Sequence, residues 1–205
     1  MDRNRIRQFW LERSRTHETT RWTPRAQLDA DLEVVKPHLD AKTVLDLGAG
    51  TGELLQPFAY RAELVTAVDM VPAFLDQIPE FQGLERVVCD LETFVPSRSY
   101  QLVLMFGVVT HLSVEDESMI YSQVTRALSA GGRAIVKHQC ADGEGFTVDR
   151  PPTADDPVGY VGRYPAIEDQ VRLLGQHFTR VEVFHYPDRL RRYDNSHDCA
   201  FVCWP

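Results

Sequence analysis

Residues 44–54 read VLDLGAGTGEL, and this segment carries the strongest fold signal in the chain. Its first part, together with Thr43, is a short apolar run with β-branched members, which is typical of a buried parallel strand. Glycines follow at alternate positions 48, 50 and 52, and an amphipathic stretch begins after them. This order predicts a strand, a tight turn and a helix, with the backbone amides of the turn open to close approach by a ligand. The spacing is not the dinucleotide fingerprint G-x-G-x-x-G, because position 53 is Glu.

The composition is that of a globular domain, with 205 residues of which 43% are hydrophobic and 25% charged. Its apolar runs are strand-sized, far shorter than the ~20 residues of a membrane helix, and the charged N-terminus lacks an apolar signal segment. The four cysteines (89, 140, 199 and 203) show neither disulfide-framework nor zinc spacing, and the histidines show no H-x-x-x-H pairing. We therefore expect a reduced, cytoplasmic protein with no membrane association and no metal.

Charge is unevenly distributed along the chain. Residues 1–25 hold seven arginines against three acids, a balance of +4. Because the net charge of the whole chain is −8, the remaining residues must carry −12. A net acidic body argues against broad nucleic-acid binding. We expect the basic N-terminal segment to pack on the acidic body; contact with an anionic substrate is the alternative.

Hydrophobic patterns predict strands that alternate with helices. Ser113 and Asp116 resemble a capping box at the start of the clearest helix, and Gly131-Gly132 is expected to close it. The strands are predicted at 43–47, 64–68, 86–89, 102–106, 133–137, 181–184 and 200–203. The helices are predicted at 3–13, 24–39, 53–60, 72–78, 113–128 and 165–178. Residues 139–164 are rich in Gly and Pro and are expected to form a long loop.

These elements predict a single α/β domain over residues 1–205, with a seven-stranded, doubly wound, mostly parallel sheet and helices on both faces. The last two strands lack a helix between them and should pair antiparallel. Within the domain we expect an N-terminal lid segment, a cofactor-binding core, an acceptor loop, and a C-terminal helix and β-hairpin. Their expected ranges are 1–24, 25–138, 139–164 and 165–205.

Acidic residues close the second and third predicted strands, at Asp69 and Asp90. Ligands of open α/β sheets bind at the carboxyl ends of the strands, where an acid can accept hydrogen bonds from ribose hydroxyls. With Asp46 before the G-x-G-x-G turn, this pattern resembles the class I S-adenosylmethionine-dependent methyltransferases over about residues 43–138. The resemblance implies the strand order 3-2-1-4-5-7-6, with strand 7 antiparallel, and S-adenosylmethionine as cofactor. An ordinary strand-end turn is the alternative for each acid taken alone.

The resemblance also implies which residues hold the cofactor. The turn would hold the methionine end, Asp69 the ribose, and Asp90 with Leu91 the adenine. The complete set is Asp46, Gly48, Ala49, Gly50, Thr51, Gly52, Asp69, Met70, Asp90, Leu91, Phe106 and Gly107.

The end of the fourth strand bears on the acceptor. Families that methylate amines of nucleic-acid bases carry an Asn/Asp-Pro-Pro-Tyr/Phe tetrapeptide there, whereas this chain has FGVV at residues 106–109, followed by THL. This departure disfavours a nucleic-acid amine and is similar to enzymes acting on small molecules. His111 follows the fourth strand and His138 ends the fifth. If the acceptor is a hydroxyl, we predict that one of them, with His111 favoured, serves as a general base, whereas an amine acceptor needs only its neutral form. The alternatives are a helix cap for His111 and a structural hydrogen bond for His138.

Residues outside the sheet core are expected to frame the acceptor. The candidates are Trp10, Trp22, Arg163, Tyr164, Tyr193, Asn195 and His197. The last three belong to the segment 187–198, for which a solvated turn is the alternative.

We therefore predict methyl transfer to O or N of a small polar acceptor such as a sugar, a nucleotide-sugar or a secondary metabolite. Two alternatives remain: methylation of RNA or protein, with the Arg-rich segment as contact, and a non-catalytic cofactor-binding partner of another methyltransferase. The sequence does not address the oligomeric state.

Overall fold

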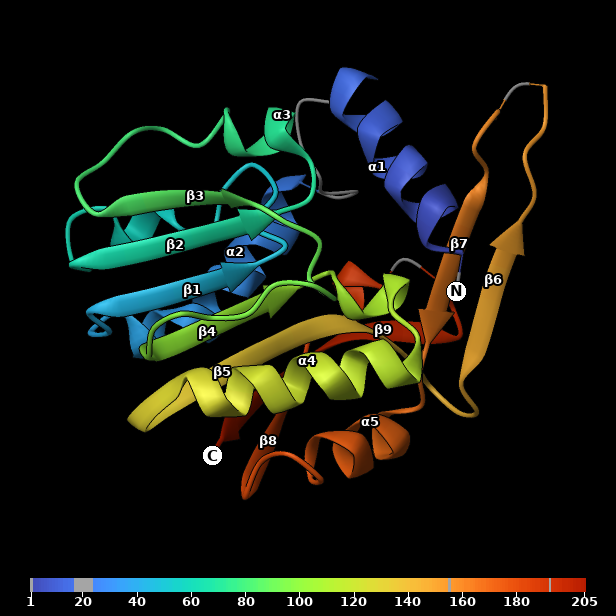
Figure 1. The fold of residues 1–205 in the computed structure, drawn as a ribbon. Coiled ribbons are helices and arrows are strands. Elements are labelled where there is room, and N and C mark those ends of the chain that lie inside the picture. Colours follow the sequence, from blue (N-terminus) through green and yellow to red (C-terminus); the bar gives the residue numbers. More distant parts are fainter. Residues whose placement is uncertain (1, 17–23, 155, 192) are drawn as a thin grey trace.

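The computed structural model describes residues 2–16, 24–154, 156–191 and 193–205. The chain forms three layers, with helices on the two faces of a twisted seven-stranded sheet (Figure 1). The strands of this sheet are β1 (Thr43–Leu47), β2 (Leu64–Asp69), β3 (Leu84–Val88), β4 (Tyr100–Phe106), β5 (Leu128–Ala141), β8 (Arg180–His185) and β9 (Ser196–Trp204). The α-helices are α1 (Arg3–Thr16), α2 (Pro24–Val35), α3 (Pro72–Leu75), α4 (Val114–Ala127) and α5 (Ile167–Leu174). None of the described helices is long and apolar enough to cross a membrane.

The sheet has the order β3-β2-β1-β4-β5-β9-β8. Strands β1 to β5 pair in parallel, and β9 pairs antiparallel with both β5 and β8. Two further strands, β6 (Phe146–Arg150) and β7 (Tyr160–Tyr164), form a separate sheet, so β8 and β9 are the sixth and seventh strands of the large one. Counted within the large sheet, the observed order corresponds to the predicted 3-2-1-4-5-7-6.

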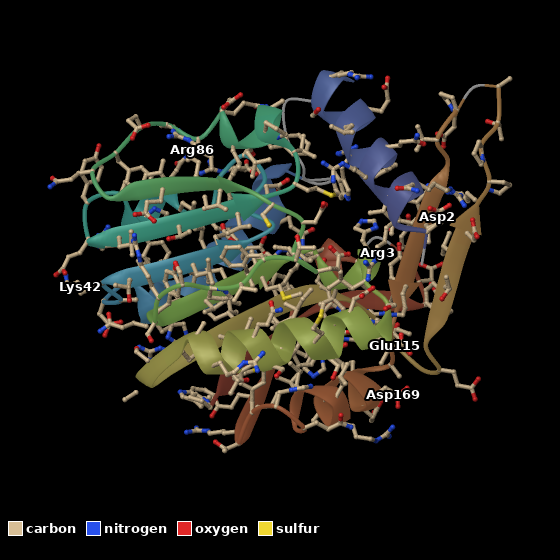
Figure 2. All side chains as sticks on the ribbon, in the orientation of Figure 1. Asp2, Arg3, Lys42, Arg86, Glu115 and Asp169 are labelled. Atoms are coloured by element: carbon tan, nitrogen blue, oxygen red, sulfur yellow. The ribbon has the colours of Figure 1, made fainter. Side chains whose placement is uncertain are left out.

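Each face of the sheet has its own hydrophobic core. Ile120 and Val124 of α4 pack with Leu174 of α5 on one face. Val35 of α2 packs with Leu75 of α3 on the other. Charged side chains such as Lys42, Glu115 and Asp169 lie on the outside of the layers (Figure 2). Apolar burial on both faces explains why β1, β2 and β4 read as nearly continuous apolar runs.

The interval 139–164 is not one long loop. β5 continues to Ala141, and β6 pairs antiparallel with β7 in register from Phe146↔Tyr164 to Arg150↔Tyr160. Tyr160 and Tyr164 are buried at alternate positions of β7. Glycines and prolines dominated the sequence pattern and concealed this two-residue period.

The predicted helix 53–60 is also corrected. Turns and a 3₁₀ helix, Gln56–Phe58, take its place. Pro57 has no N–H to donate to the carbonyl four residues before it, so an α-helix cannot run through this position. The glycine turn therefore does not lead directly into an α-helix.

The glycine pair Gly131-Gly132 does not close α4, which ends at Ala127. Both glycines belong to β5 instead, and a Cβ at Gly132 would lie 3.0 Å from the carbonyl oxygen of Tyr100 on β4. The pair therefore permits close approach of two strands where their register shifts. The predicted N-cap is confirmed, because the Ser113 side chain accepts a hydrogen bond from the Asp116 N–H.

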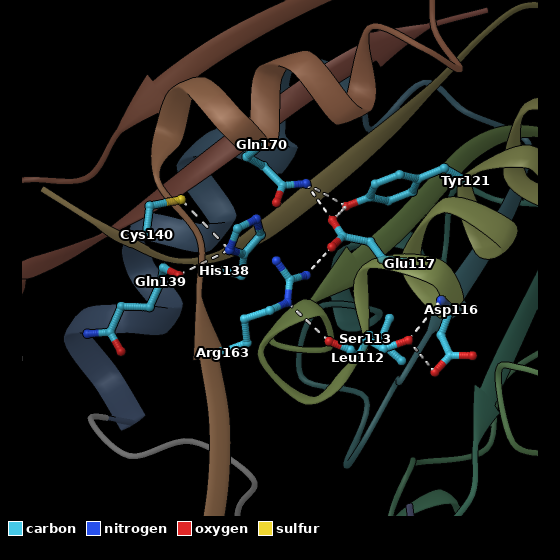
Figure 3. A network of polar contacts seen from close by, with 10 residues as sticks. All are labelled: Leu112, Ser113, Asp116, Glu117, Tyr121, His138, Gln139, Cys140, Arg163 and Gln170. Carbon is cyan, nitrogen blue, oxygen red and sulfur yellow. Dashed lines mark hydrogen bonds and ion pairs between the residues drawn. The ribbon is translucent and has the colours of Figure 1, made fainter. Parts of the chain in front are cut away.

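A buried polar network joins α4, β7 and α5 (Figure 3). The fully buried Glu117 carboxylate forms an ion pair with Arg163 and accepts hydrogen bonds from Tyr121 Oη and Gln170 Nε2, each at 2.5 Å. Burial, and then the adjacent carboxylate, raise the pKa of Tyr121 well above its ordinary value, so the phenol stays a donor. Arg163 Nε also donates to the carbonyl of Leu112 at 3.2 Å. The network ties the β6–β7 sheet to the large sheet.

We expect Glu117→Gln to lower the free energy of unfolding by about 3–5 kcal/mol, because it leaves the Arg163 charge buried without its counter-ion. Urea unfolding monitored by circular dichroism measures this change. Glu85→Gln is the control, since its ion pair with Arg98 is 44% and 49% exposed and should contribute less than about 1 kcal/mol. Equal losses in the two variants would contradict the role of the network.

Candidate active site

A pocket of about 470 Å³ opens at the carboxyl ends of β1, β2, β4 and β5, beneath α1. Of the predicted cofactor residues, all but Gly52 line it. The carboxyl ends of parallel strands meet at this edge because each crossover returns the chain to the opposite edge. The pocket therefore lies where the order of strands reverses, beside β1 and β4.

The glycine turn is held by the backbone of the neighbouring strand. The N–H groups of Gly48 and Ala49 both donate to the carbonyl of Val68, at 2.8 and 2.9 Å. Gly48, Gly50 and Gly52 have φ of 77°, 52° and 72°, a region that side chains disfavour. A Cβ at Gly52 would lie 2.8 Å from Ile78, so this glycine serves packing and not the pocket wall.

Asp69 connects the end of β2 to the glycine turn. Its Oδ2 accepts from the Gly50 N–H and its Oδ1 from the Val71 N–H, both at 2.9 Å. Burial raises the pKa of this carboxyl, and the backbone hydrogen bonds oppose the rise. Each oxygen retains a further lone pair, and Asp69 lines the pocket, so it can accept from both hydroxyls of a ribose.

Helix α1 covers the pocket through charged contacts. Arg7 Nη1 lies 2.7 Å from Asp90 Oδ2, and Arg3 pairs with Asp116 on α4. Arg5 anchors the helix to the smaller sheet through Asp149 Oδ1 at 2.7 Å. The basic N-terminal segment thus packs on acidic groups of the body, as expected, and it does so over the pocket mouth.

His111 lines the pocket from the short 3₁₀ helix Val109–His111. Its Nδ1 lies 3.0 Å from the carbonyl oxygen of Val161, so Nδ1 carries the proton and Nε2 presents a lone pair. The ring is enclosed by aromatic groups, with Trp10 and Tyr160 centroids at 5.3 and 5.8 Å. Burial lowers the pKa of His111 to about 4, and the imidazole is therefore neutral at ordinary pH.

His138 also lines the pocket, from β5, but it is 1% exposed and stacks on Phe201. Its Nδ1 donates to the Gln139 carbonyl at 3.1 Å, and its buried Nε2 has no hydrogen-bond partner among the described residues. Burial again lowers the pKa to about 4. The two predicted histidines share one pocket, and His111 is the more accessible of them.

Sequence reasoning missed a second polar group in the pocket, formed by Lys137, Asp198, Asp31 and Gln27. Lys137 Nζ lies 2.9 Å from Asp198 Oδ1 and 3.9 Å from Asp31 Oδ1. Gln27 donates to Asp198 Oδ2 at 2.8 Å. Burial raises the pKa of Asp198, but the Lys137 charge and these hydrogen bonds outweigh it and lower the pKa. In the sequence, the available signal for this second polar group was Lys137, a charged residue at the end of an apolar strand.

The predicted acceptor residues separate into two groups. Trp10 and Tyr164 line the pocket, and Trp22 lies outside the described residues. The other four are away from the pocket, which corrects their expected placement. Arg163 belongs to the Glu117 network, and His197 bonds to Asp142. Tyr193 and Asn195 are exposed in the turn before β9, because β9 begins at Ser196 and holds this turn beyond the pocket edge.

Residues 44–132 match the family model described as a methyltransferase domain. The chain is similar to phosphoethanolamine N-methyltransferase 1 of Triticum aestivum, at 24% identity over 156 residues that cover 68% of this chain and 31% of that enzyme. It thus spans less than a third of that relative's length.

Two solved structures have similar folds. One is the DhpI-SAM-HEP complex, with a TM-score of 0.75, 17% identity and coverage of 98% of this chain and 97% of that chain. The other is 1,6-didemethyltoxoflavin-N1-methyltransferase of Burkholderia thailandensis with bound 1,6-didemethyltoxoflavin and S-adenosylhomocysteine, with a TM-score of 0.79, 19% identity and coverage of 98% and 88%.

The sheet order, the glycine turn with Asp69 and the matched domain agree in what the chain resembles. Residues 44–132 are similar to a methyltransferase domain, and the fold is similar to that of a solved methyltransferase structure with bound S-adenosylhomocysteine.

The neutral state of His138 predicts a pH-dependent stability. Between its ordinary pKa of 6.5 and its folded pKa of about 4, the unfolded chain binds a proton that the folded protein does not. The contribution of the neutral ring to the free energy of unfolding is therefore complete above pH 6.5 and declines as the pH falls towards 4. At about pH 5 the loss amounts to roughly 2 kcal/mol. We expect the free energy of unfolding, measured in urea, to change less between about pH 7.5 and about pH 5 in His138→Gln than in the wild type. An equal change in the two proteins would contradict this prediction.

Proposed function

We propose that this protein transfers a methyl group from S-adenosylmethionine to O or N of a small polar molecule held between the sheet edge and α1. One observation carries the proposal. A single pocket joins the glycine turn and Asp69 to a second polar group, Lys137 and Asp198, with His111 among its walls. The first part suits the cofactor and the second suits an acceptor.

The residues present fit the cofactor. The carboxylate of Asp69 retains lone pairs for a diol, and Asp90 with Leu91 offers an acid beside an apolar surface at the pocket wall. The left-handed glycines keep side chains off the turn at this point. The cofactor supplies an electrophilic methyl group on a sulfonium, so the protein has to align the acceptor and accept a proton.

The covering helix supports a small acceptor. α1 closes the pocket mouth with Arg3 and Arg7, and Trp10 adds an apolar wall that also contacts the His111 ring. Lys137, Asp198 and Gln27 present a donor, an acceptor and an amide to polar substituents. Residues 26–205 carry the negative charge excess, which disfavours a nucleic-acid acceptor.

His111 is the proposed proton acceptor. Its Nδ1–H is held by the Val161 carbonyl, which leaves Nε2 unprotonated on the ring that lines the pocket. A pKa of about 4 keeps this nitrogen deprotonated through the neutral range. His138 lies deeper in the pocket than His111, on β5. It is better placed to hold the acceptor in position than to take its proton.

Incubation with methyl-labelled cofactor and separated small-molecule, RNA and protein fractions of a cell extract tests the acceptor class. Label in the small-molecule fraction supports the proposal. Label confined to RNA or protein would reject it in favour of a macromolecular acceptor. Cofactor binding without label in any fraction would favour a non-catalytic partner.

Asp69→Ala should weaken cofactor binding by roughly 2–3 kcal/mol, because it removes charge-assisted hydrogen bonds to the ribose. Titration calorimetry with S-adenosylhomocysteine measures the change. Asp76→Asn is the control, since Asp76 is exposed at the end of α3 and does not line the pocket. Unchanged affinity in Asp69→Ala would remove Asp69 from the cofactor site.

His111→Gln should lower kcat by about 10²–10⁴ while cofactor affinity stays nearly constant, because a general base acts in the transition state. The wild-type rate should stay level down to about the His111 pKa of 4 if the fold persists there. His177→Gln is the control, as His177 bonds to Ser118 outside the pocket. Near-full turnover in both His111→Gln and His138→Gln would reject a histidine base and favour an amine that enters neutral.

A further inference from the structure

Two antiparallel strands bring three metal-binding side chains to one face of the sheet. His197 and Cys199 are two residues apart on β9, so they point to the same face. Cys199 lies directly opposite His185 of β8 in the antiparallel register. The intervening Asp198 points to the other face, where it reaches Lys137. The three side chains are therefore separate from the cofactor pocket, and none of them is among the described residues that line it.

The ligand atoms have the spacing of a tetrahedral metal site. His185 Nδ1 lies 3.0 Å from His197 Nε2 and 3.8 Å from Cys199 Sγ, and all three atoms lie within 4.8 Å of one another. Around a tetrahedral zinc ion, bond lengths of about 2.0–2.3 Å place neighbouring ligand atoms roughly 3.3–3.6 Å apart. The separations of His185 Nδ1 from His197 Nε2 and Cys199 Sγ are within about 0.3 Å of these values, and the third separation is at most 4.8 Å.

A carboxylate already orients the central histidine. Asp142, which follows β5, accepts a hydrogen bond from His197 Nδ1 and is itself bound by Arg191 Nη1 at 2.5 Å. This contact leaves the lone pair on Nε2, the atom that faces His185. A carboxylate that fixes the distal nitrogen of an imidazole is the usual second partner of a metal-bound histidine.

We propose that His185, His197 and Cys199 bind a single zinc ion, with Asp142 as the positioning residue for His197. Two imidazoles and a thiolate favour zinc over magnesium or calcium. The ion enters from solvent on the exposed side of His185, whereas His197 and Cys199 are buried. Water takes the fourth position.

Binding changes the protonation of the ligands in a defined way. In the free site His185 Nδ1–H donates to His197 Nε2, and Cys199 is a thiol. On binding, the His185 proton moves to its other ring nitrogen, Cys199 loses its proton to solvent, and bonds form from the metal to Nδ1, Nε2 and Sγ. Net release is one proton per ion, with no change of oxidation state.

The location gives the ion a structural task. It would join β8 to β9 and, through Asp142 and Arg191, hold the turn between them. Asp198 stands between two of the ligands in β9, so the ion would also stabilise the strand that carries this pocket carboxylate.

Cobalt(II) substitution of the tag-free, chelator-treated full chain tests the site. We expect tetrahedral ligand-field bands, a thiolate-to-cobalt absorption, and displacement of both by one zinc per chain. Magnesium should leave the spectrum unchanged. An increase in the melting temperature with zinc, but not with magnesium, is the second readout.

Variants distinguish the proposed ligands from their neighbours. His185→Asn and Cys199→Ser should each lose the cobalt spectrum and weaken zinc binding by roughly 100-fold or more. His185 is exposed, so its variant should fold normally. Asp142→Asn should weaken zinc binding by about 10–100-fold. Cys203→Ser is the matched control, a buried thiol on the same face of β9, and should bind as the wild type. An absent thiolate band in the wild type, or full zinc affinity in His185→Asn, would overturn the site.

Discussion

The contact between the turn after β1 and the end of β2 is the constraint on which the site depends. The carbonyl of Val68 accepts two N–H groups of the turn, and the carboxylate of Asp69 accepts a third from Gly50. These bonds are possible because the turn glycines adopt left-handed backbone angles. The turn is therefore fixed by the neighbouring strand and not by a following helix. Asp69 has a double role, since the oxygens that hold the turn are also the oxygens that face the pocket.

Charge complementarity then closes the site. The arginines of α1 meet acids from three separate parts of the body: Asp90 after β3, Asp116 in α4 and Asp149 in β6. Each exposed pair contributes little free energy alone, but together they define where α1 lies. The helix also brings Trp10 against His111, so α1 and the proposed base share one aromatic cluster.

Buried polar groups position the elements around the pocket. Glu117 and its partners bind β7 to α4 and α5, and β7 supplies the carbonyl that orients His111. On the other face, Lys137 and Asp198 join β5 to β9. Such groups are costly to bury unless every charge has a partner, and their arrangement therefore selects one packing of these elements.

The sequence by itself determined the class of fold, the glycine turn and the strand-end residues that line the pocket. Strand periodicity and the turn glycines are local properties, and a residue at the end of a parallel strand must lie at the ligand-binding edge. It did not determine the β6–β7 sheet, because glycines and prolines masked the alternation of Tyr160 and Tyr164. Nor could it pair Lys137 with Asp198 or place His185 beside Cys199, since these contacts depend on the exact antiparallel register of β9 against β5 and β8. Register is set by packing both faces of the sheet, and only the tertiary structure decides it.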